Sequence, residues 1–249
     1  MIVRHSEDVT ITTLPNSDLK GKLLVARDDI MGHIAYDVSV ETGDVLKLRS
    51  SDSGGLDHMY YCISGSGIVK ASNGKTYILQ PDTFIAFSSG IEAELSVESR
   101  LRLYVIYSED INPSSERAVA NSLKEIIGTE KDVDWKRGHS RRFLVKADGF
   151  AVSFNNTLCS AGNSTKLGYM NHEESAYYIK GSTTYSWDEG ASIVKTRIGP
   201  DSGTIYNMDK HDKHVLTAHE DSIVLCVFYP ALRGDENHNH DGEYSGFDA

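Results

Sequence analysis

The sequence has few cysteines and no recognisable signal peptide, which argues against several classes of protein. It contains only three cysteines in 249 residues, and Cys62, Cys159 and Cys226 lie far apart without CxxC spacing. An odd number of isolated cysteines argues against a disulfide framework and against a thiolate zinc site. We therefore expect a reduced, cytoplasmic protein. The first residues, MIVRHSEDVTITT, also lack the apolar segment of a signal peptide.

Basic residues and long apolar runs are scarce as well. Lys and Arg number 25 against 36 Asp and Glu, which gives a formal net charge of −11. Such an acidic chain has no electrostatic route to nucleic acid or to an anionic membrane surface. No apolar run approaches the roughly 18–20 residues of a membrane-spanning helix. The chain also lacks GxSxG, P-loop, GxGxxG and HExxH motifs. We expect no nucleic-acid or membrane partner, and a small molecule as the ligand.

Helical periodicity is nearly absent, and short β-type segments dominate. Segments rich in Val, Ile, Tyr and Thr, such as KLLVARDD, HIAYDVSV and RLRLYVIYSE, are separated by Gly, Asn, Asp and Ser clusters. This spacing is typical of an all-β sandwich or barrel. The sequence predicts a helix over 114–127, because Ser114 can begin it, Glu116 lies in its first turn and Gly128 follows its end.

The strand pattern repeats after this predicted helix. KLLVARDD returns as RFLVKADG, MYYCISGSG returns as SAYYIKGST, and RLYVIYSE returns as IVLCVFYP. Five segments recur in the same order at a nearly constant offset, which indicates an internal duplication. We predict two homologous β-barrels in tandem. The first is a degenerate barrel over 1–112, a linker helix follows over 113–128, and the barrel with the active site covers 129–249.

Donor groups for a metal ion gather in the second half. The segment GTIYNMDKHDKH offers Tyr206, His211 and His214, and the upstream segment YMNHEESAYYIKG offers Glu174 just before a predicted strand. Carboxylate, phenolate and imidazole suit a hard to borderline divalent ion. We predict Glu174, Tyr206 and His214 as ligands of iron(II), with zinc as the second choice. Tyr206 can equally be an aromatic residue of the barrel wall with the histidines in a solvated turn, and His211 can ligate in place of His214.

The first repeat lacks these donors. At the three corresponding positions it has His58, Ile85 and Ala93, two of which are apolar. We therefore expect the first barrel to be a structural partner and the second to carry the chemistry. His58 beside Asp57 is left as a candidate for a weak site.

Further residues of the second half can contact a small ligand, and each has an ordinary alternative. They are Trp135 with Arg142, Asn155 with Thr157, Cys226 with Phe228, and the tail residues Glu236 and His238. A Trp near an Arg can hold a zwitterion or form a core edge with a surface ion pair. Asn155 and Thr157 can form hydrogen bonds with a ligand or with the backbone of a turn. Cys226 and Phe228 can simply pack in the core. The tail, GDENHNHDG, can close over the barrel with an acid/base pair or be a disordered acidic segment.

These segments resemble a known family. Tandem β-barrels with donors at strand ends resemble the cupin superfamily, which has double-stranded β-helix (jelly-roll) barrels, and the second half resembles ectoine synthase. The resemblance rests on WKRGHSRRFLV, SFNNT, YMNHEESAYYIKG, GTIYNMDKHDKHVLTA, VLCVFYP and GDENHNHDG. The first half resembles the same fold weakly. The sequence departs from the family in two extra residues after Trp135, in the turn GSTTYSWDEG, in Glu173 and in the fused first barrel.

The resemblance implies a bicupin enzyme with the following roles. It implies iron ligands at Glu174, Tyr206 and His214, substrate contacts at Trp135, Arg142, Asn155, Thr157, Cys226 and Phe228, and catalytic positions at Tyr169, Glu236 and His238. The implied reaction belongs to ectoine biosynthesis, which makes a compatible solute. In it, N-γ-acetyl-diaminobutyrate or a close analogue closes to a cyclic tetrahydropyrimidine carboxylate with loss of water, so the protein would be a metal-dependent hydro-lyase.

The duplication and the chemistry leave alternatives open. Single-barrel family members pair as homodimers, so the fused barrels predict a monomer with an intrachain pseudo-dimer. The first alternative is another iron-dependent bicupin enzyme, a dioxygenase or isomerase acting on a small amino-acid derivative. The second is a non-catalytic cupin that binds a small molecule.

Overall fold

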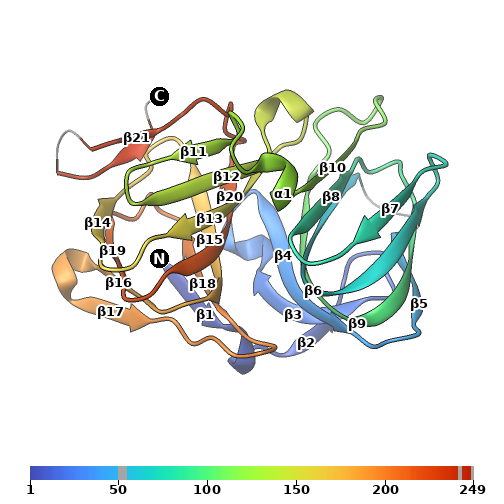
Figure 1. The fold of residues 1–249 in the computed structure, drawn as a ribbon, viewed down its shortest axis with the longest axis horizontal. Coiled ribbons are helices and arrows are strands. Elements are labelled where there is room, and N and C mark those ends of the chain that lie inside the picture. The colour runs from blue at the N-terminus through green and yellow to red at the C-terminus, as the bar shows by residue number, and fades with distance from the viewer. Residues whose placement is uncertain (50–54, 241–242, 248–249) are drawn as a thin grey trace.

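Strands dominate the computed structural model, which describes residues 1–49, 55–240 and 243–247 (Figure 1). The helices of these residues are short: one α-helix, α1 (Leu123–Ile126), and the 3-10 helices η1 (Ser6–Asp8), η2 (Arg27–Asp29), η3 (Lys146–Asp148) and η4 (Asp188–Gly190). In the described ranges, no helix has the length and apolar character needed to cross a membrane. The predicted all-β class is confirmed. Residues 241–242, within the tail segment GDENHNHDG, lie outside the described residues.

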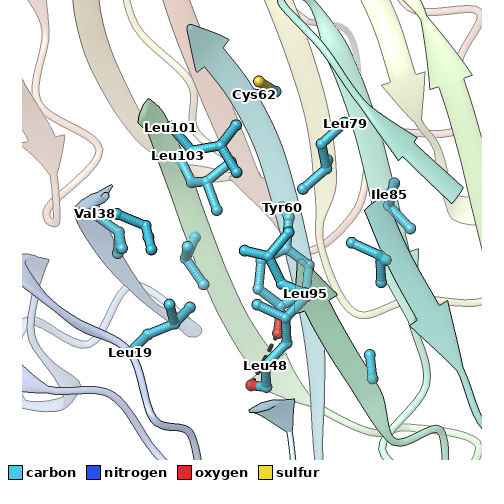
Figure 2. Packing of buried hydrophobic residues seen from close by; sticks show 14 of the residues in the cluster. Leu19, Val38, Leu48, Tyr60, Cys62, Leu79, Ile85, Leu95, Leu101 and Leu103 are labelled. Atoms are coloured by element: carbon cyan, nitrogen blue, oxygen red, sulfur yellow. Dashed lines mark hydrogen bonds between the residues drawn. The ribbon is translucent and has the colours of Figure 1, made fainter. Parts of the chain in front are cut away.

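The first barrel consists of one sheet around its own core. Its order is β10-β8-β6-β9-β4-β3-β2, with β5 paired to β9 and β7 paired to β6. The strands are β2 (Ile11–Thr13), β3 (Lys20–Val25), β4 (His33–Val40), β5 (Val45–Arg49), β6 (Leu56–Ala71), β7 (Thr76–Leu79), β8 (Thr83–Phe87), β9 (Ala93–Glu109) and β10 (Ala118–Ser122). Figure 2 shows the core between these strands, where the Tyr60 hydroxyl donates to the Leu48 carbonyl at 3.2 Å. This core is apolar and contains Leu79, Leu95 and Leu103.

The second barrel is formed by two facing sheets. The larger has the order β1-β18-β15-β20-β13-β12-β11, the smaller β14-β19-β16-β17, and β21 pairs with β22. The strands are β1 (Ile2–His5), β11 (Asp132–Asp134), β12 (Gly138–Leu144), β13 (Ser153–Cys159), β14 (Ser164–Leu167), β15 (Glu173–Lys180), β16 (Thr183–Trp187), β17 (Ser192–Lys195), β18 (Thr204–Met208), β19 (His214–Ala218), β20 (Ser222–Tyr229), β21 (His238–Asn239) and β22 (Gly246–Phe247). Residues of both sheets share one buried cluster, which is the interior of the second barrel.

The two halves exchange their first strands. Strand β1, from the start of the chain, pairs with β18 of the second barrel, with Val3 opposite Tyr206. Strand β10, from the start of the second repeat, pairs with β8 of the first barrel, with Ala120 opposite Ile85. Because Ile85 and Tyr206 occupy corresponding positions of the two repeats, the exchange is reciprocal. Each barrel is completed by a strand of the other half.

The barrels pack through the outer faces of their large sheets. Side chains alternate along a strand, so Tyr60 of β6 points into the first barrel while Tyr61 points to the second. Tyr61 accepts a hydrogen bond from the Asn156 amide at 2.7 Å, and the corresponding Tyr177 donates to Asp37 at 2.7 Å. Apolar residues of both halves form one continuous cluster at this interface. The pattern of contacts across it is approximately twofold.

The helix predicted over 114–127 is mostly wrong. Residues 118–122 form β10, and the helix is only α1. Pairing with β8 satisfies the backbone of this segment in a strand, so tertiary context overrides the local propensity. The cap is Ser122, not Ser114, because the Glu125 carboxylate accepts from the Ser122 amide at 2.8 Å in a capping box. Gly128 does follow the helix, with a positive φ of 79°.

Candidate active site

The inner face of the large sheet in the second barrel brings the predicted residues into adjacent rows. Arg142 lies opposite Asn155, and Asn155 lies opposite Cys226. In the next strands Ala176 lies opposite both Cys226 and Tyr206. This register gathers side chains that are far apart in the sequence on one buried surface.

A small cavity of about 30 Å³ lies inside this barrel. The predicted site residues that line it are Trp135, Thr157, Tyr169, Glu174, Cys226, Phe228 and His238. Ser140, Tyr178, Tyr185 and Phe247 also line it and had not been singled out in the sequence. Tyr178 could have been found, because it has the same strand parity as Glu174 and must point to the same side. A water molecule needs about 10–15 Å³, so the cavity holds only a few waters as it stands.

Asn155 and Arg142 are buried with unused hydrogen-bonding groups, and neither is among the residues that line the cavity. Among the residues described, neither the amide nitrogen nor the amide oxygen of Asn155 has a partner. Arg142 Nη2 donates to the backbone oxygen of Glu236, while its Nε and Nη1 lack hydrogen-bond partners in the described part of the chain. Buried polar groups are normally paired, so these unpaired groups make Asn155 and Arg142 candidates for contacts with a ligand.

Glu236 has a different place from the one expected for an acid/base group. Its carboxylate accepts hydrogen bonds from the Arg233 amide at 2.7 Å and the Gly234 amide at 2.9 Å. Burial raises the pKa of Glu236, but these amide bonds outweigh it and the net pKa is lowered. Glu236 is not among the cavity-lining residues, and it lies 3.7 Å from Arg142 Nη1. The contacts support a role in holding Arg142 and the tail.

The tail folds against the barrel instead of extending into solvent. The ring of His238 lies 5.1 Å from that of Trp135 and 4.9 Å from that of Phe247. Phe247 stacks on Tyr169 at 4.8 Å, and the Ser245 amide donates to the Lys166 carbonyl at 2.9 Å. Burial lowers the pKa of His238 to about 3, with nearby His240 and Arg142 contributing, so its imidazole is neutral at pH 7.

Glu174 and His214 have the properties of metal ligands. Glu174 is buried, and burial raises its pKa to about 7. His214 donates through Nδ1 to the Asp212 carbonyl at 2.8 Å, which leaves Nε2 as the acceptor. Within the described ranges this Nε2 has no partner. Burial lowers the pKa of His214 to about 4, so the neutral, ligating form prevails. Each group is of a type that binds a divalent ion.

Tyr206 does not complete a three-residue site in this arrangement. Its hydroxyl donates to the Val194 carbonyl at 3.2 Å, and burial raises its pKa well above the usual range. The ring of Tyr185 stacks on Tyr206 at 3.9 Å and on His214 at 5.0 Å. His214 lies on β19, Tyr185 on β16 and Val194 on β17, and these three strands are neighbours in that order. Because the Tyr206 hydroxyl bonds to Val194, the Tyr185 ring lies between the rings of His214 and Tyr206.

The described residues contain no group of three His, Cys, Asp or Glu side chains that could hold a metal ion. That finding does not cover a tyrosine ligand; because the Tyr185 ring lies between Tyr206 and His214, the three predicted ligands are not gathered around one point in this arrangement, and the ligand set stays a prediction.

The other candidate histidines are occupied by backbone or hydroxyl groups. His211 Nδ1 bonds the Tyr169 carbonyl at 2.9 Å, and the ring is partly exposed. His58 in the first barrel contacts the Tyr60 hydroxyl through Nδ1 and the Ile91 carbonyl through Nε2, each at 2.9 Å. Both rings contribute to local structure in this arrangement.

Comparisons with known proteins match the second part of the chain to one family. The family model described as ectoine synthase matches residues 118–247. The L-ectoine synthase of Desulfatibacillum aliphaticivorans is 38% identical over 132 residues, covering 52% of this chain and 98% of the relative. That of Halalkalibacterium halodurans is 37% identical over 123 residues, covering 49% and 92%.

The fold of the whole chain is found in other proteins. Oxalate decarboxylase from Bacillus subtilis superposes with a TM-score of 0.66 at 12% identity, covering 94% of this chain and 77% of that one. This similarity shows the fold alone and confirms tandem cupin barrels, a bicupin. Since the ectoine synthase model covers the second repeat from its exchanged strand to β22, the chain belongs to the ectoine synthase family.

Proposed function

We propose that the protein is a cyclodehydratase of the ectoine synthase type. It closes N-γ-acetyl-diaminobutyrate, or a close analogue, to a cyclic tetrahydropyrimidine carboxylate with loss of one water. The observation that carries the proposal is the family match over 118–247, which falls on the barrel with the enclosed cavity. The first barrel has no role in the chemistry.

Arg142 is the group that binds the substrate carboxylate. It is 1% exposed and has two N–H groups without hydrogen-bond partners among the described residues, on the side chain best suited to a carboxylate. Asn155, directly opposite on β13, has an amide group without partners among the described residues, which can bond the acetamide or the amine. Thr157 and Phe228 line the cavity together with His238 of the tail. These contacts hold the amine close to the acetamide carbon. This lowers the entropic cost of ring closure.

Glu174 is suited to the proton transfers. With a pKa of about 7 it can both accept and release a proton at neutral pH. It takes the proton of the substrate ammonium group, and the free amine then attacks the acetamide carbon to form the new C–N bond. Glu174 returns its proton to the former carbonyl oxygen, and the nitrogen of the new bond gives up a second proton to the same oxygen. With both protons in place the C–O bond breaks and water leaves.

The tail keeps bulk water out of the cavity. His238 and Phe247 line it, and both pack on aromatic residues of the barrel. Excluding water favours loss of water from the tetrahedral intermediate over the reverse hydrolysis. Tyr169, buried beneath Phe247, positions this cover.

We extend the proposal to a divalent metal, iron(II) before zinc, because carboxyl and imidazole groups suit such an ion and Nε2 of His214 lacks a partner among the described residues. An ion on Glu174 would keep that carboxylate deprotonated, so the proton transfers assigned to Glu174 hold only while it is not a ligand. Such an ion supplies Lewis-acid polarisation of a carbonyl oxygen when bound. No step is assigned to it in the present arrangement, since Tyr206 is separated from His214 by the Tyr185 ring.

We also propose that one chain is the working unit. The reciprocal pairing of β1 with β18 and of β10 with β8 supports a pseudo-dimer within one polypeptide. Light scattering should give the mass of one 27.5 kDa chain, and a stable two-chain particle would contradict this.

The function is tested with the full chain purified anaerobically and supplied with iron(II) or zinc. N-γ-acetyl-diaminobutyrate should lose the mass of one water. Glu174→Ala should abolish turnover, whereas His58→Gln, at the corresponding position of the first repeat, should retain it. Absence of the dehydrated product in the wild-type protein with either ion would refute the proposal.

A further inference from the structure

The first barrel has a pocket of its own, at the end where β4 and β6 begin and β9 ends. Its volume is about 150 Å³, compared with about 30 Å³ for the cavity of the second barrel, and the two share no lining residue. A water molecule occupies about 30 Å³ of liquid, so the pocket has room for several waters or one small organic molecule. Its lining residues include Arg27, His33, Ile34, Leu56, Ser108 and Glu109.

His33 brings an unused hydrogen-bond acceptor to this pocket. Its side chain is 5% exposed, and its Nδ1 donates to the Met31 carbonyl at 2.8 Å. The other ring nitrogen, Nε2, is therefore the acceptor of a neutral imidazole, and it has no partner among the described residues. Burial lowers the pKa of His33 to about 4, so the ring stays neutral at pH 7. A ligand that satisfies Nε2 has to supply an N–H or O–H group.

Ser108 adds a second unused group beside His33. The two residues lie opposite each other in the pairing of β4 with β9, so their side chains are neighbours on one face of the sheet. Ser108 is buried, and within the described ranges its hydroxyl also lacks a partner. Buried polar groups are normally paired. Two unpaired neighbours that line one pocket therefore indicate that the pocket binds a ligand.

The charged residues of the pocket restrict the chemistry of that ligand. Arg27 and Glu109 both line the pocket and are exposed, so they bring opposite charges to its solvent side. A bare metal ion would be repelled by Arg27, and a simple carboxylate would leave Nε2 of His33 without a donor. A molecule with both a carboxylate and an ammonium group satisfies all of these residues.

We propose that the first barrel binds a small zwitterionic amino acid in this pocket. The ligand carboxylate binds the Arg27 guanidinium and the Ser108 hydroxyl. The ligand ammonium donates to Nε2 of His33 and to the Glu109 carboxylate, and its short apolar chain packs on Leu56. This site is independent of the reaction proposed for the second barrel.

The proposal is tested by isothermal titration calorimetry of the full chain with L-2-aminobutyrate, which has both charged groups and a short apolar chain. Arg27→Gln should weaken binding about tenfold, because it removes a charge-assisted hydrogen bond to the carboxylate. His33→Leu should weaken it by a similar factor. The matched control is Arg100→Gln, at an exposed arginine of the same barrel outside the pocket, and it should bind as the wild type does.

Two further comparisons locate the site and identify the ligand class. Arg142→Gln removes the carboxylate group proposed for the second barrel and should leave binding of L-2-aminobutyrate unchanged. Butyrate and propylamine, which each lack one charged group, should bind at least about tenfold more weakly. Near-ultraviolet circular dichroism checks the fold of His33→Leu; if that variant is unfolded, the exposed Arg27→Gln decides. Equal affinity of Arg27→Gln and wild type, loss of binding in Arg142→Gln, equal binding of butyrate, or no binding by the wild type would each overturn the proposal.

Discussion

Replacing Arg102 with methionine should destabilise the protein strongly, because this residue joins the two barrels through a buried charge. Arg102 donates to both carboxylate oxygens of Asp37 at 3.0 Å, to the Tyr177 hydroxyl at 2.8 Å and to the Pro200 carbonyl at 3.2 Å. The side chains of Arg102 and Asp37 are only 3% and 2% exposed. Tyr177 and Pro200 belong to the second half, so the network crosses the interface.

The magnitude follows from what the substitution leaves behind. Without Arg102, the buried Asp37 carboxylate keeps the Tyr177 hydroxyl, which donates at 2.7 Å, but has lost its counter-ion. Breaking a buried pair by removing one partner costs about 3–5 kcal/mol. Domains of this kind are stable by roughly 5–15 kcal/mol, so Arg102→Met should remove a large part of the total.

A neighbouring arginine provides the matched control. Arg100 lies on the same strand and also bridges to the second half, through Asp201 at 2.8 Å, but its side chain is 48% exposed. A solvent-exposed ion pair contributes little to stability, so Arg100→Met should be nearly neutral. Urea unfolding followed by far-ultraviolet circular dichroism measures both. Equal losses in Arg102→Met and Arg100→Met would refute the reasoning.

Two further predictions concern pH and the tail. Burial and the neighbouring Asp110 carboxylate raise the pKa of Asp57 to about 7, against about 3.9 for an aspartate in an unfolded chain. Between these two pKa values the folded state binds a proton that the unfolded chain has lost, so the free energy of unfolding should fall as pH rises from about 4 to 7. Asp57→Asn should flatten this slope. Urea unfolding at several pH values measures it. A chain ending at Pro230 should bind iron(II) but lose turnover, because it lacks His238 and Phe247; full turnover would contradict the role of the tail.

Much of the second barrel could be predicted because its inner face follows strand parity. GTIYNM and EESAYY alternate in a way that places Tyr206 and Glu174 on one face, and the structure has both pointing into the same barrel. The repeat predicted two barrels, since residues of equal parity recur in the same order. The boundaries assigned to the two domains stay a prediction.

Other features depend on contacts that no local pattern specifies. The segment around Val119 has caps and charges typical of a helix, but pairing with β8 of the other barrel determines its structure. Glu236 looks like an acid/base group, yet it caps the amides of its own turn. Tyr185 is one tyrosine among many in the sequence, and only the facing of two sheets places it between His214 and Tyr206.

The account is tested most directly by the fate of the acetamide oxygen. N-γ-acetyl-diaminobutyrate carrying heavy-isotope oxygen in its acetyl group is incubated with the iron(II)-loaded full chain, and the products are weighed by mass spectrometry. The account predicts a cyclic product that retains both acetyl carbons and has lost the label as water. Labelled acetate with free diaminobutyrate would show hydrolysis instead, and it would contradict the claim that the second barrel closes the ring.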